Sequence, residues 1–342
     1  MLWPTLEMLL GLAIILVLWL GGREVLLQRM NVGDFVAYNT YMVQLTWPVI
    51  ALGWVINIFQ RGTASLGRIN EIFSEQPEVT DAKAAPDLKE VPTIDGDVEF
   101  RGLTFRYPTG PQVLSGIDLR IPAGTSLAIV GPTGSGKSTL VSLIPRIYDG
   151  APGSVLIDGR PITDFPLETL RKNIGFVPQE TFLFSSSIRD NIALGTEHSR
   201  EEEVEMAAEA ASLAKEIQGF PQGYATVVGE RGLTLSGGQK QRTAIARAII
   251  RNPRILILDD ALSSVDTYTE ESILNHLREI MQGRTTIFIS HRVSTVRAAD
   301  QIAVLHGGEI VELGTHEDLL ARNGYYADLY NKQLLEEELA KV

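Results

Sequence analysis

Gly131-Pro132-Thr133-Gly134-Ser135-Gly136-Lys137-Ser138 is the stretch that decides the fold of this chain of 342 residues. It matches the pattern G-x4-G-K-[ST] and stands between a predicted strand and a predicted helix, the context that gives the pattern meaning. Glycines let backbone N–H groups close around phosphates at a helix N-terminus, whose dipole favours anions. Lys137 can then reach the outer phosphates, and the Ser138 hydroxyl can bind Mg²⁺. The stretch, with Thr139 after it, predicts a P-loop.

Short apolar runs on both sides of this loop predict a parallel sheet. Each run has about four to six core residues, is rich in β-branched residues and is apolar on both faces, as buried parallel strands are. Helical patterns alternate with these runs, which indicates an α/β domain. A hairpin around Gly307 and Gly308 and an acidic helix over residues about 325–342 are also predicted. The four runs are SLAIVG (126–131), NIGFVPQ (173–179), ILILDD (255–260) and TTIFIS (285–290).

The composition excludes several classes of function. Net charge is −12, from 30 basic and 42 acidic residues, whereas a phosphate backbone calls for clustered Lys and Arg. We therefore expect no nucleic-acid partner. The chain has no cysteine, so disulfides, thiolate metal sites and cysteine nucleophiles are excluded.

The first sixty or so residues are strongly apolar and predict two membrane spans. Residues 8–22 carry no charge, and residues 2–7 extend them to the roughly 20 residues that a bilayer span needs. Residues 35–60 are also uncharged, and Pro48 with several amide side chains predicts a helix packed against others or facing a cavity. A signal peptide would carry basic residues before its apolar core, and here none precede it. The open alternative is two buried helices of a soluble domain.

The same pattern predicts the domain boundaries. We expect a transmembrane part at residues 1–70, with spans at about 2–22 and 35–60, and a linker rich in proline and charge at 71–95. The amphipathic stretch RGTASLGRINEIF (61–73) should continue the second helix. Residues 96–342 then form the soluble domain. Because two spans are too few to enclose a transport path, we expect the chain to lack upstream helices.

A second glycine-rich segment, Leu235-Ser236-Gly237-Gly238-Gln239, lies about 20 residues before the apolar strand that ends in Asp259. A P-loop, LSGGQ and such a strand, in this order over residues about 96–330, resemble the ABC ATPase family. The resemblance implies an α/β P-loop NTPase with a helical subdomain, preceded by two transmembrane α-helices. It also implies ATP and Mg²⁺ as cofactors, with Ser138 and Asp259 on the metal. LSGGQ would cap the γ-phosphate of ATP held by an opposing subunit, because Ser and two glycines at a helix start make a second phosphate cradle.

Four further positions match motifs of this family. Tyr107, in FRYP, matches the aromatic residue that stacks on adenine, and Gln179, in VPQ, matches the glutamine that senses Mg²⁺. Ser263-Ser264-Val265-Asp266 stands where the D-loop belongs, with Asp266 contacting the partner. His291, in ISHR, matches the switch histidine on the γ-phosphate. Taken alone, a Tyr before Pro and a His after a strand would be ordinary packing and surface residues.

Gly229-Glu230-Arg231-Gly232, just before LSGGQ, resembles the X-loop of exporters, a segment associated with intracellular coupling helices. Together with spans on the same chain, it favours an exporter over an importer ATPase. By resemblance the two spans correspond to the fifth and sixth helices of a six-helix domain. Basic residues flank the second span on both sides and do not decide its orientation. The implied cytoplasmic ATPase decides it and places a multi-pass chain in the plasma or inner membrane.

The residue after Asp259 departs from the family pattern. The family has Glu here, which orients and polarises the attacking water, and this chain has Asp260. On an unchanged backbone the carboxylate lies about 1.5 Å further back, although a general base must be within hydrogen-bond reach of its proton. Misplacement of this size can cost about 10²-fold in rate. We therefore predict a degenerate site in one subunit of a heterodimeric exporter; a tolerated conservative change is the alternative.

The sequence thus predicts an ATP-hydrolysing subunit of an ABC exporter that works as a head-to-tail dimer in the lipid bilayer. Its partner would be a second half-transporter, in a heterodimer rather than a homodimer, and its expected catalytic residues are Asp260, His291 and Gln179. The alternatives are a soluble ABC ATPase of DNA repair or translation, and a regulatory nucleotide-binding subunit with little catalysis. Nothing in the sequence indicates the exported substrate.

Overall fold

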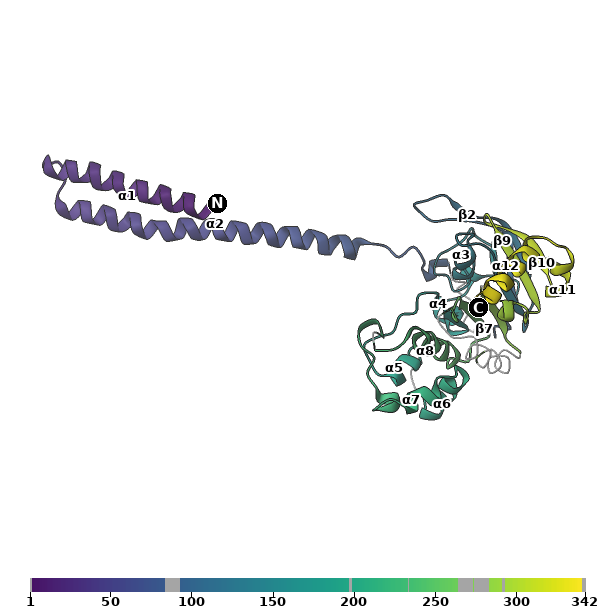
Figure 1. Cartoon of the computed structure of the whole chain (residues 1–342). Helices are drawn as coiled ribbons and strands as arrows, with labels where there is room; N and C mark the ends of the chain where they lie inside the picture. The colour runs from purple at the N-terminus through teal and green to yellow at the C-terminus, as the bar shows by residue number, and fades with distance from the viewer. Residues whose placement is uncertain are drawn as a thin grey trace. The chain divides into compact units, whose positions relative to one another are not determined.

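The computed structural model describes residues 2–83, 93–196, 199–232, 234–263, 273, 283–290 and 293–339. The chain divides into two compact units, Met1–Pro77 and Glu78–Val342 (Figure 1).

The N-terminal unit is a pair of long helices, α1 (Leu2–Leu26) and α2 (Val32–Ser74). Asn31 caps α2, because its side-chain oxygen accepts a hydrogen bond of 2.8 Å from the Asp34 backbone N–H. Both helices are long and apolar enough to cross a membrane, and their most apolar windows are not buried within the unit. Exposed apolar surface of this extent is typical of a membrane or partner interface and not of a soluble core. As expected, α2 continues without a break through residues 61–73, and Pro48 lies inside it.

The centre of the second unit is a six-stranded sheet in the order β10-β9-β3-β8-β7-β6. The four apolar runs of the sequence form four of these strands, and they pair in parallel as predicted. Ile255 and Ile257 of β7 face one hydrophobic cluster, whereas Leu256 and Leu258 face another on the opposite side of the sheet. This double burial explains why the runs are apolar on both faces. The strands are β3 (Ser126–Val130), β6 (Ile174–Val177), β7 (Ile255–Asp259) and β8 (Thr285–Ile289).

Antiparallel strands complete the second unit. The predicted hairpin is present, with β9 (Gln301–His306) and β10 (Glu309–Gly314) on either side of the two glycines. A separate four-stranded sheet in the order β2-β1-β4-β5 was not predicted. Its two long strands alternate buried and exposed residues, but register shifts interrupt the alternation where β1 and β2 pair. The strands of this sheet are β1 (Val98–Arg106), β2 (Gln112–Ile121), β4 (Val155–Ile157) and β5 (Arg160–Pro161).

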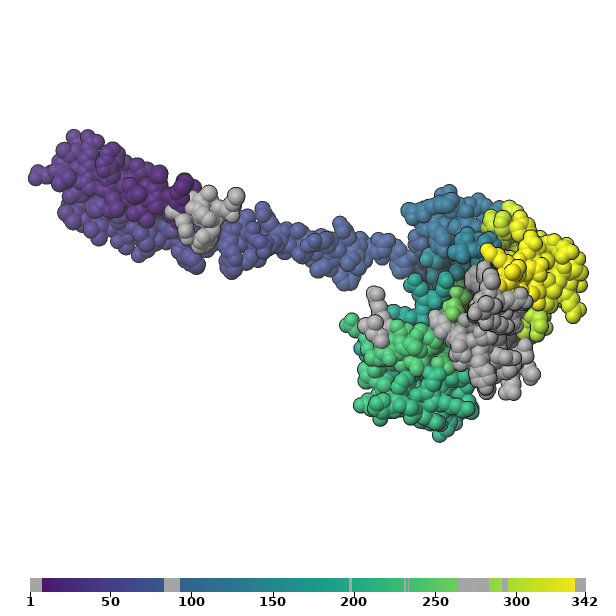
Figure 2. All heavy atoms as spheres, viewed as in Figure 1, coloured from purple at the N-terminus to yellow at the C-terminus, as the bar shows by residue number. Residues whose placement is uncertain are grey.

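Short helices cover both faces of the parallel sheet. One hydrophobic cluster joins the sheet to the antiparallel strands and to α3, and the other joins it to a lobe of four helices, α5–α8, which is green in Figure 2. The helices are α3 (Lys137–Ser142), α4 (Leu167–Lys172), α5 (Ile188–Ile192), α6 (Glu201–Ala210), α7 (Ala214–Gln218), α8 (Gly237–Ile249), α10 (Val293–Val296), α11 (His316–Ala321) and α12 (Tyr325–Leu339). Four 3-10 turns are also present, at Asp81–Lys83, Ile162–Asp164, Gly223–Ala225 and Glu230–Gly232.

Candidate functional site

The loop between β3 and α3 is closed by glycines at which another residue would be strained or would collide. Gly136 precedes α3 with a φ of 102°, a left-handed conformation that L side chains rarely adopt. A Cβ on Gly136 would lie 2.8 Å from the Leu114 side chain, and a Cβ on Gly131 would collide with the Leu305 carbonyl oxygen. The predicted P-loop therefore folds as a tight curl held against β2 and β9, with the start of α3 at its open end.

Lys137 lies inside this curl. Its Nζ donates hydrogen bonds of 2.9 Å to the carbonyl oxygens of Gly131 and Pro132, and the side chain is almost fully buried. Burial lowers the pKa of the Lys137 ammonium group, and the nearby carboxylates of Asp259 and Asp260 oppose this shift. A buried cation whose contacts include two neutral carbonyls favours the approach of an anion. The residue is thus placed to exchange these carbonyls for phosphate oxygens.

Ser138 and Asp259 form the pair that the sequence assigned to Mg²⁺. The Ser138 Oγ donates a hydrogen bond of 3.0 Å to Asp259 Oδ1 at the end of β7. Burial raises the pKa of the Asp259 carboxyl, an effect that the Ser138 hydrogen bond opposes. No group of three His, Cys, Asp or Glu with metal-site spacing occurs among the residues that the structure describes. A hydroxyl and one carboxylate nevertheless fit Mg²⁺, which commonly takes one or two protein carboxylates and completes its shell with water and substrate phosphates.

A pocket of about 310 Å³ lies at the carboxyl ends of β7 and β8, in front of the loop. This is where open α/β sheets bind ligands. Asp260 lines the pocket next to Asp259, and Gln179 reaches it from the segment after β6. The structure thus brings together nine of the predicted site residues: Thr133, Gly134, Gly136, Lys137, Ser138, Thr139, Gln179, Asp259 and Asp260.

Tyr107 lies beside the site without lining the pocket. Its hydroxyl is 2.9 Å from Thr139 Oγ1, and its ring packs edge-on against Phe105 and Tyr148. These contacts hold the ring against the start of α3. They leave adenine stacking by Tyr107 as a prediction.

The LSGGQ segment lies apart from this pocket, at the N-terminus of α8. The Ser236 Oγ accepts a hydrogen bond of 3.2 Å from the Gln239 N–H, and Gln239 Oε1 accepts one of 2.9 Å from the Ser236 N–H. This reciprocal pair caps the helix. The Gln239 amide is further held by a hydrogen bond of 2.8 Å to Glu216, which also forms an ion pair with Arg242. Ser236 and Gly237 are exposed, with Gly238 partly so, as an element that meets a ligand outside its own chain should be.

The structure does not place three of the predicted side chains in the site. Asp266 and His291 lie outside the described residues, so their assigned roles stay predictions. Ser135 is described, but its hydroxyl is buried without a hydrogen-bond partner, and it does not line the pocket. Its contribution to the site is its place in the loop backbone.

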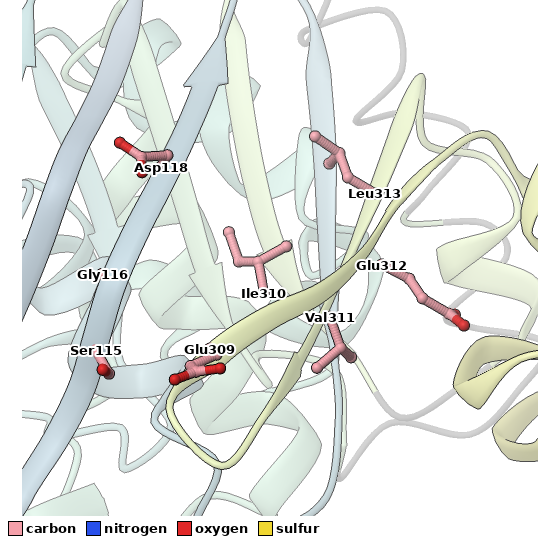
Figure 3. Close-up of a pocket in the computed structure, with 8 residues that line it drawn as sticks. All are labelled: Ser115, Gly116, Asp118, Glu309, Ile310, Val311, Glu312 and Leu313. Atoms are coloured by element: carbon pink, nitrogen blue, oxygen red, sulfur yellow. The ribbon is translucent and has the colours of Figure 1, made fainter.

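The structure adds two features that the sequence did not indicate. A pocket of about 480 Å³ opens between β2 and β10 and is lined by Asp118, Glu309 and Glu312 among others (Figure 3). It contains none of the predicted site residues. The other feature is a contact between Gln241 of α8 and Ser263, the residue that closes the turn after Asp260. In the sequence, Gln241 stands two positions after LSGGQ and Ser263 opens the predicted D-loop segment, but neither position indicated this contact.

The chain is similar to known proteins of one family. Residues 114–263 match the family described as "ABC transporter". The chain is 43% identical over 333 residues to the "Probable multidrug resistance ABC transporter ATP-binding/permease protein YheI" of Bacillus subtilis (strain 168), covering 97% of this chain and 56% of that protein. It is 44% identical over 338 residues to the "ATP-dependent lipid A-core flippase" of Syntrophus aciditrophicus (strain SB), covering 99% of this chain and 56% of the flippase.

A solved structure agrees in fold as well. It is described as "Structure of a bacterial Atm1-family ABC exporter with ATP bound", and it matches with a TM-score of 0.75 and 41% identity. The match covers 90% of this chain and 53% of that one. The chain therefore spans about half the length of the curated relatives it matches.

Proposed function

We propose that this chain, which carries an ABC transporter domain, is the ATP-binding and ATP-hydrolysing part of an exporter. The observation that carries the proposal is the pocket in front of the P-loop. The pocket is lined by a buried lysine at the N-terminus of α3 and by a hydroxyl–carboxylate pair, Ser138 and Asp259, whose oxygen atoms are 3.0 Å apart. Phosphate at a helix N-terminus beside Mg²⁺ is the chemistry that these groups fit.

Each described residue then has a defined role. Lys137 binds the outer phosphates, Ser138 and Asp259 hold Mg²⁺, and Gln179 lies where it can respond to the metal. When bound, Mg²⁺ would neutralise charge that develops on the transferred phosphoryl group. Asp260 lines the same pocket, and in this proposal it orients the attacking water. Tyr107 on adenine and His291 on the γ-phosphate complete the proposed set.

The exposed N-terminus of α8 supports a dimer. Ser236 and Gly237 are exposed, and the segment does not line the pocket of its own chain. We therefore propose that Ser236–Gln239 covers a nucleotide held by a second subunit, with Asp266 at the same interface. Because Asp260 replaces Glu, we favour a partner with a competent catalytic carboxylate, so that the subunits form a heterodimer with one slow and one fast site.

The two N-terminal helices support a membrane location. Both candidate spans, Met8–Leu26 and Val32–Ser74, are long and apolar enough to cross a membrane. The curated relatives are named as a permease and a flippase. We propose a multi-pass protein of the plasma or inner membrane whose second unit faces the cytoplasm. The exported substrate is left open, and no feature of the chain favours the soluble ABC ATPases of DNA repair or translation.

The test uses the full chain purified in lipid nanodiscs. Lys137→Ala should weaken binding of a fluorescent ATP analogue by at least tenfold and remove hydrolysis, because one charge-assisted phosphate contact is lost. Lys172→Ala is the matched control, since it removes an exposed lysine of α4 away from the pocket. Binding that is equally strong in both variants would refute the assignment. Recovery of the chain in the soluble fraction, without detergent, would refute the membrane location.

A further inference from the structure

The turn after β7 holds Asp260 in an uncommon backbone conformation. Asp260 has a φ of 48°, in the left-handed region that costs L residues energy and that Asp tolerates better than most. Its N–H donates a hydrogen bond of 3.1 Å to the Ile289 carbonyl and so continues the pairing of β7 with β8. Its carbonyl oxygen accepts hydrogen bonds from both the N–H (3.3 Å) and the Oγ (3.0 Å) of Ser263. Ser263 therefore closes the turn that aims the Asp260 carboxylate.

Gln241 holds Ser263 from the other side. Its Nε2 donates a hydrogen bond of 2.9 Å to Ser263 Oγ, across 22 residues of sequence. The Gln241 side chain is only 5% exposed, and buried polar side chains are kept in place by their hydrogen bonds. A continuous series of hydrogen bonds therefore runs from α8 through Ser263 to the Asp260 carbonyl oxygen.

We propose that Gln241 and Ser263 are positioning residues for hydrolysis, which hold the Asp260 turn and with it the carboxylate in the pocket. The proposal rests on the proposed function, because it assigns Asp260 to the attacking water. A left-handed residue persists only where its surroundings hold it. Once Ser263 loses Gln241, the turn can relax toward an ordinary φ, and the carboxylate moves away from its place beside Asp259.

The same helix gives this contact a second consequence. Gln241 lies one turn after Ser236, the cap of α8, and a helix transmits displacement as a rigid element. A shift of the LSGGQ segment, when it engages a nucleotide on the partner, would therefore reach the Asp260 turn of its own chain. The two sites of a dimer would be linked through one side chain.

Steady-state kinetics on the full chain in nanodiscs test this proposal. Gln241→Leu and Ser263→Ala should each lower kcat by about tenfold or more, because displacement of a reacting group by about 1 Å can cost 10²-fold. The KM for ATP should stay within twofold, since neither residue lines the pocket. The double variant should be no slower than the slower single variant, as expected for residues of one network. Ser263→Thr, which keeps the hydroxyl, should recover most of the turnover that Ser263→Ala loses.

Thr243→Val is the matched control. Thr243 is a fully buried residue of α8 whose hydroxyl donates a hydrogen bond to the backbone carbonyl of Gln239 and not to the turn, and its replacement should leave kcat unchanged. An unchanged kcat in Gln241→Leu, a raised KM alone, or additive losses in the double variant would overturn the proposal. A kcat loss of equal size in Thr243→Val would do the same.

Hydrogen exchange separates this inference from the proposed function. Gln241→Leu should speed exchange of the Ser263 amide, which donates to the Asp260 carbonyl within the turn, and of the Asp260 amide, which donates to Ile289 of β8. Unchanged exchange overturns the positioning role whatever the kinetics show. A wild-type chain that binds no ATP, with faster exchange in Gln241→Leu, contradicts the proposed function and supports the link between Gln241 and the turn.

Discussion

Replacement of Asp260 by Glu tests the catalytic assignment directly. The change adds one carbon–carbon bond, so the carboxylate reaches about 1.5 Å further into the pocket that Asp260 already lines. If a short reach is what limits turnover, kcat should rise by about 10²-fold, the cost attributed to misplacement of this size. The KM for ATP should change little, because Lys137, Ser138 and Asp259 are untouched.

The same substitution carries a cost in stability. At a φ of 48°, Glu lacks the short side chain that lets Asp adopt left-handed backbone, so we expect a loss of about 1 kcal/mol. For a folded unit of this size that loss corresponds to a fall of about 2–4 °C in Tm. A faster but less stable enzyme is the pattern expected of a site whose strain serves catalysis.

The assay is phosphate release at saturating Mg²⁺ and ATP, with the full chain in nanodiscs. Lys137→Ala in each background gives the contribution of contaminating ATPases. Asp260→Asn is the matched control, because it removes the negative charge from a side chain of the same length. It should lower the rate of hydrolysis further only if the Asp260 carboxylate still acts on the attacking water. A wild-type rate equal to that of Asp260→Glu, together with a slow Asp260→Asn, would refute the degenerate site and favour a tolerated conservative change.

Two further predictions concern Asp259, the proposed Mg²⁺ ligand, and Ser236, the cap of α8. Burial raises the pKa of the Asp259 carboxyl above its ordinary 3.8, so the folded state binds the carboxyl proton more tightly than the unfolded state does. The free energy of unfolding therefore falls as pH rises from the unfolded-state pKa to the folded-state pKa. Above the folded-state pKa the loss of stability is complete. Asp259→Asn should therefore raise the Tm of the nucleotide-free chain at neutral pH, by about 2–4 °C per kcal/mol, and abolish hydrolysis; calorimetry at neutral and acidic pH should find the gain smaller in acid. Ser236→Arg should lower hydrolysis by the dimer at least tenfold, because it replaces the exposed helix cap that we propose covers the partner's nucleotide. Binding of a fluorescent nucleotide at Lys137 should keep its Kd, and a matching loss of binding would contradict the division of roles.

The parallel sheet could be predicted from the sequence because its strands are buried on both faces. Ile255 to Leu258 alternate between two hydrophobic clusters, so the run is apolar throughout and easily recognised. The antiparallel sheet lacks this signal. Each of its long strands has one exposed face, and its register shifts at Gly102 and Gly116, both with positive φ, interrupt the period of two.

The residues that the structure brings together could be predicted from the sequence, but the hydrogen bonds that hold them from neighbouring elements could not. The P-loop and the end of β7 are local patterns, and the structure brings Ser138 within 3.0 Å of Asp259 as their assigned chemistry requires. The contact from Gln241 to Ser263 depends on how α8 lies beside the turn that follows β7. Pattern reading along the chain does not reach such contacts, because neither residue has a motif role that implies the other.

The identity of residue 260 and its backbone conformation explain each other only when taken together. From the sequence, Asp in place of Glu is a shortened carboxylate and therefore a weaker base. In the structure, the same Asp occupies a left-handed turn in which its short side chain is an advantage. The longer reach of the carboxylate favours Glu at position 260, whereas the left-handed backbone favours Asp. Which residue suits the position therefore depends on whether the subunit needs fast hydrolysis or a stable turn. A subunit that mainly binds ATP and offers Ser236–Gln239 to a partner gains more from a stable turn than from a longer reach, and Asp260 is therefore consistent with the slow site that we propose for one half of a dimer.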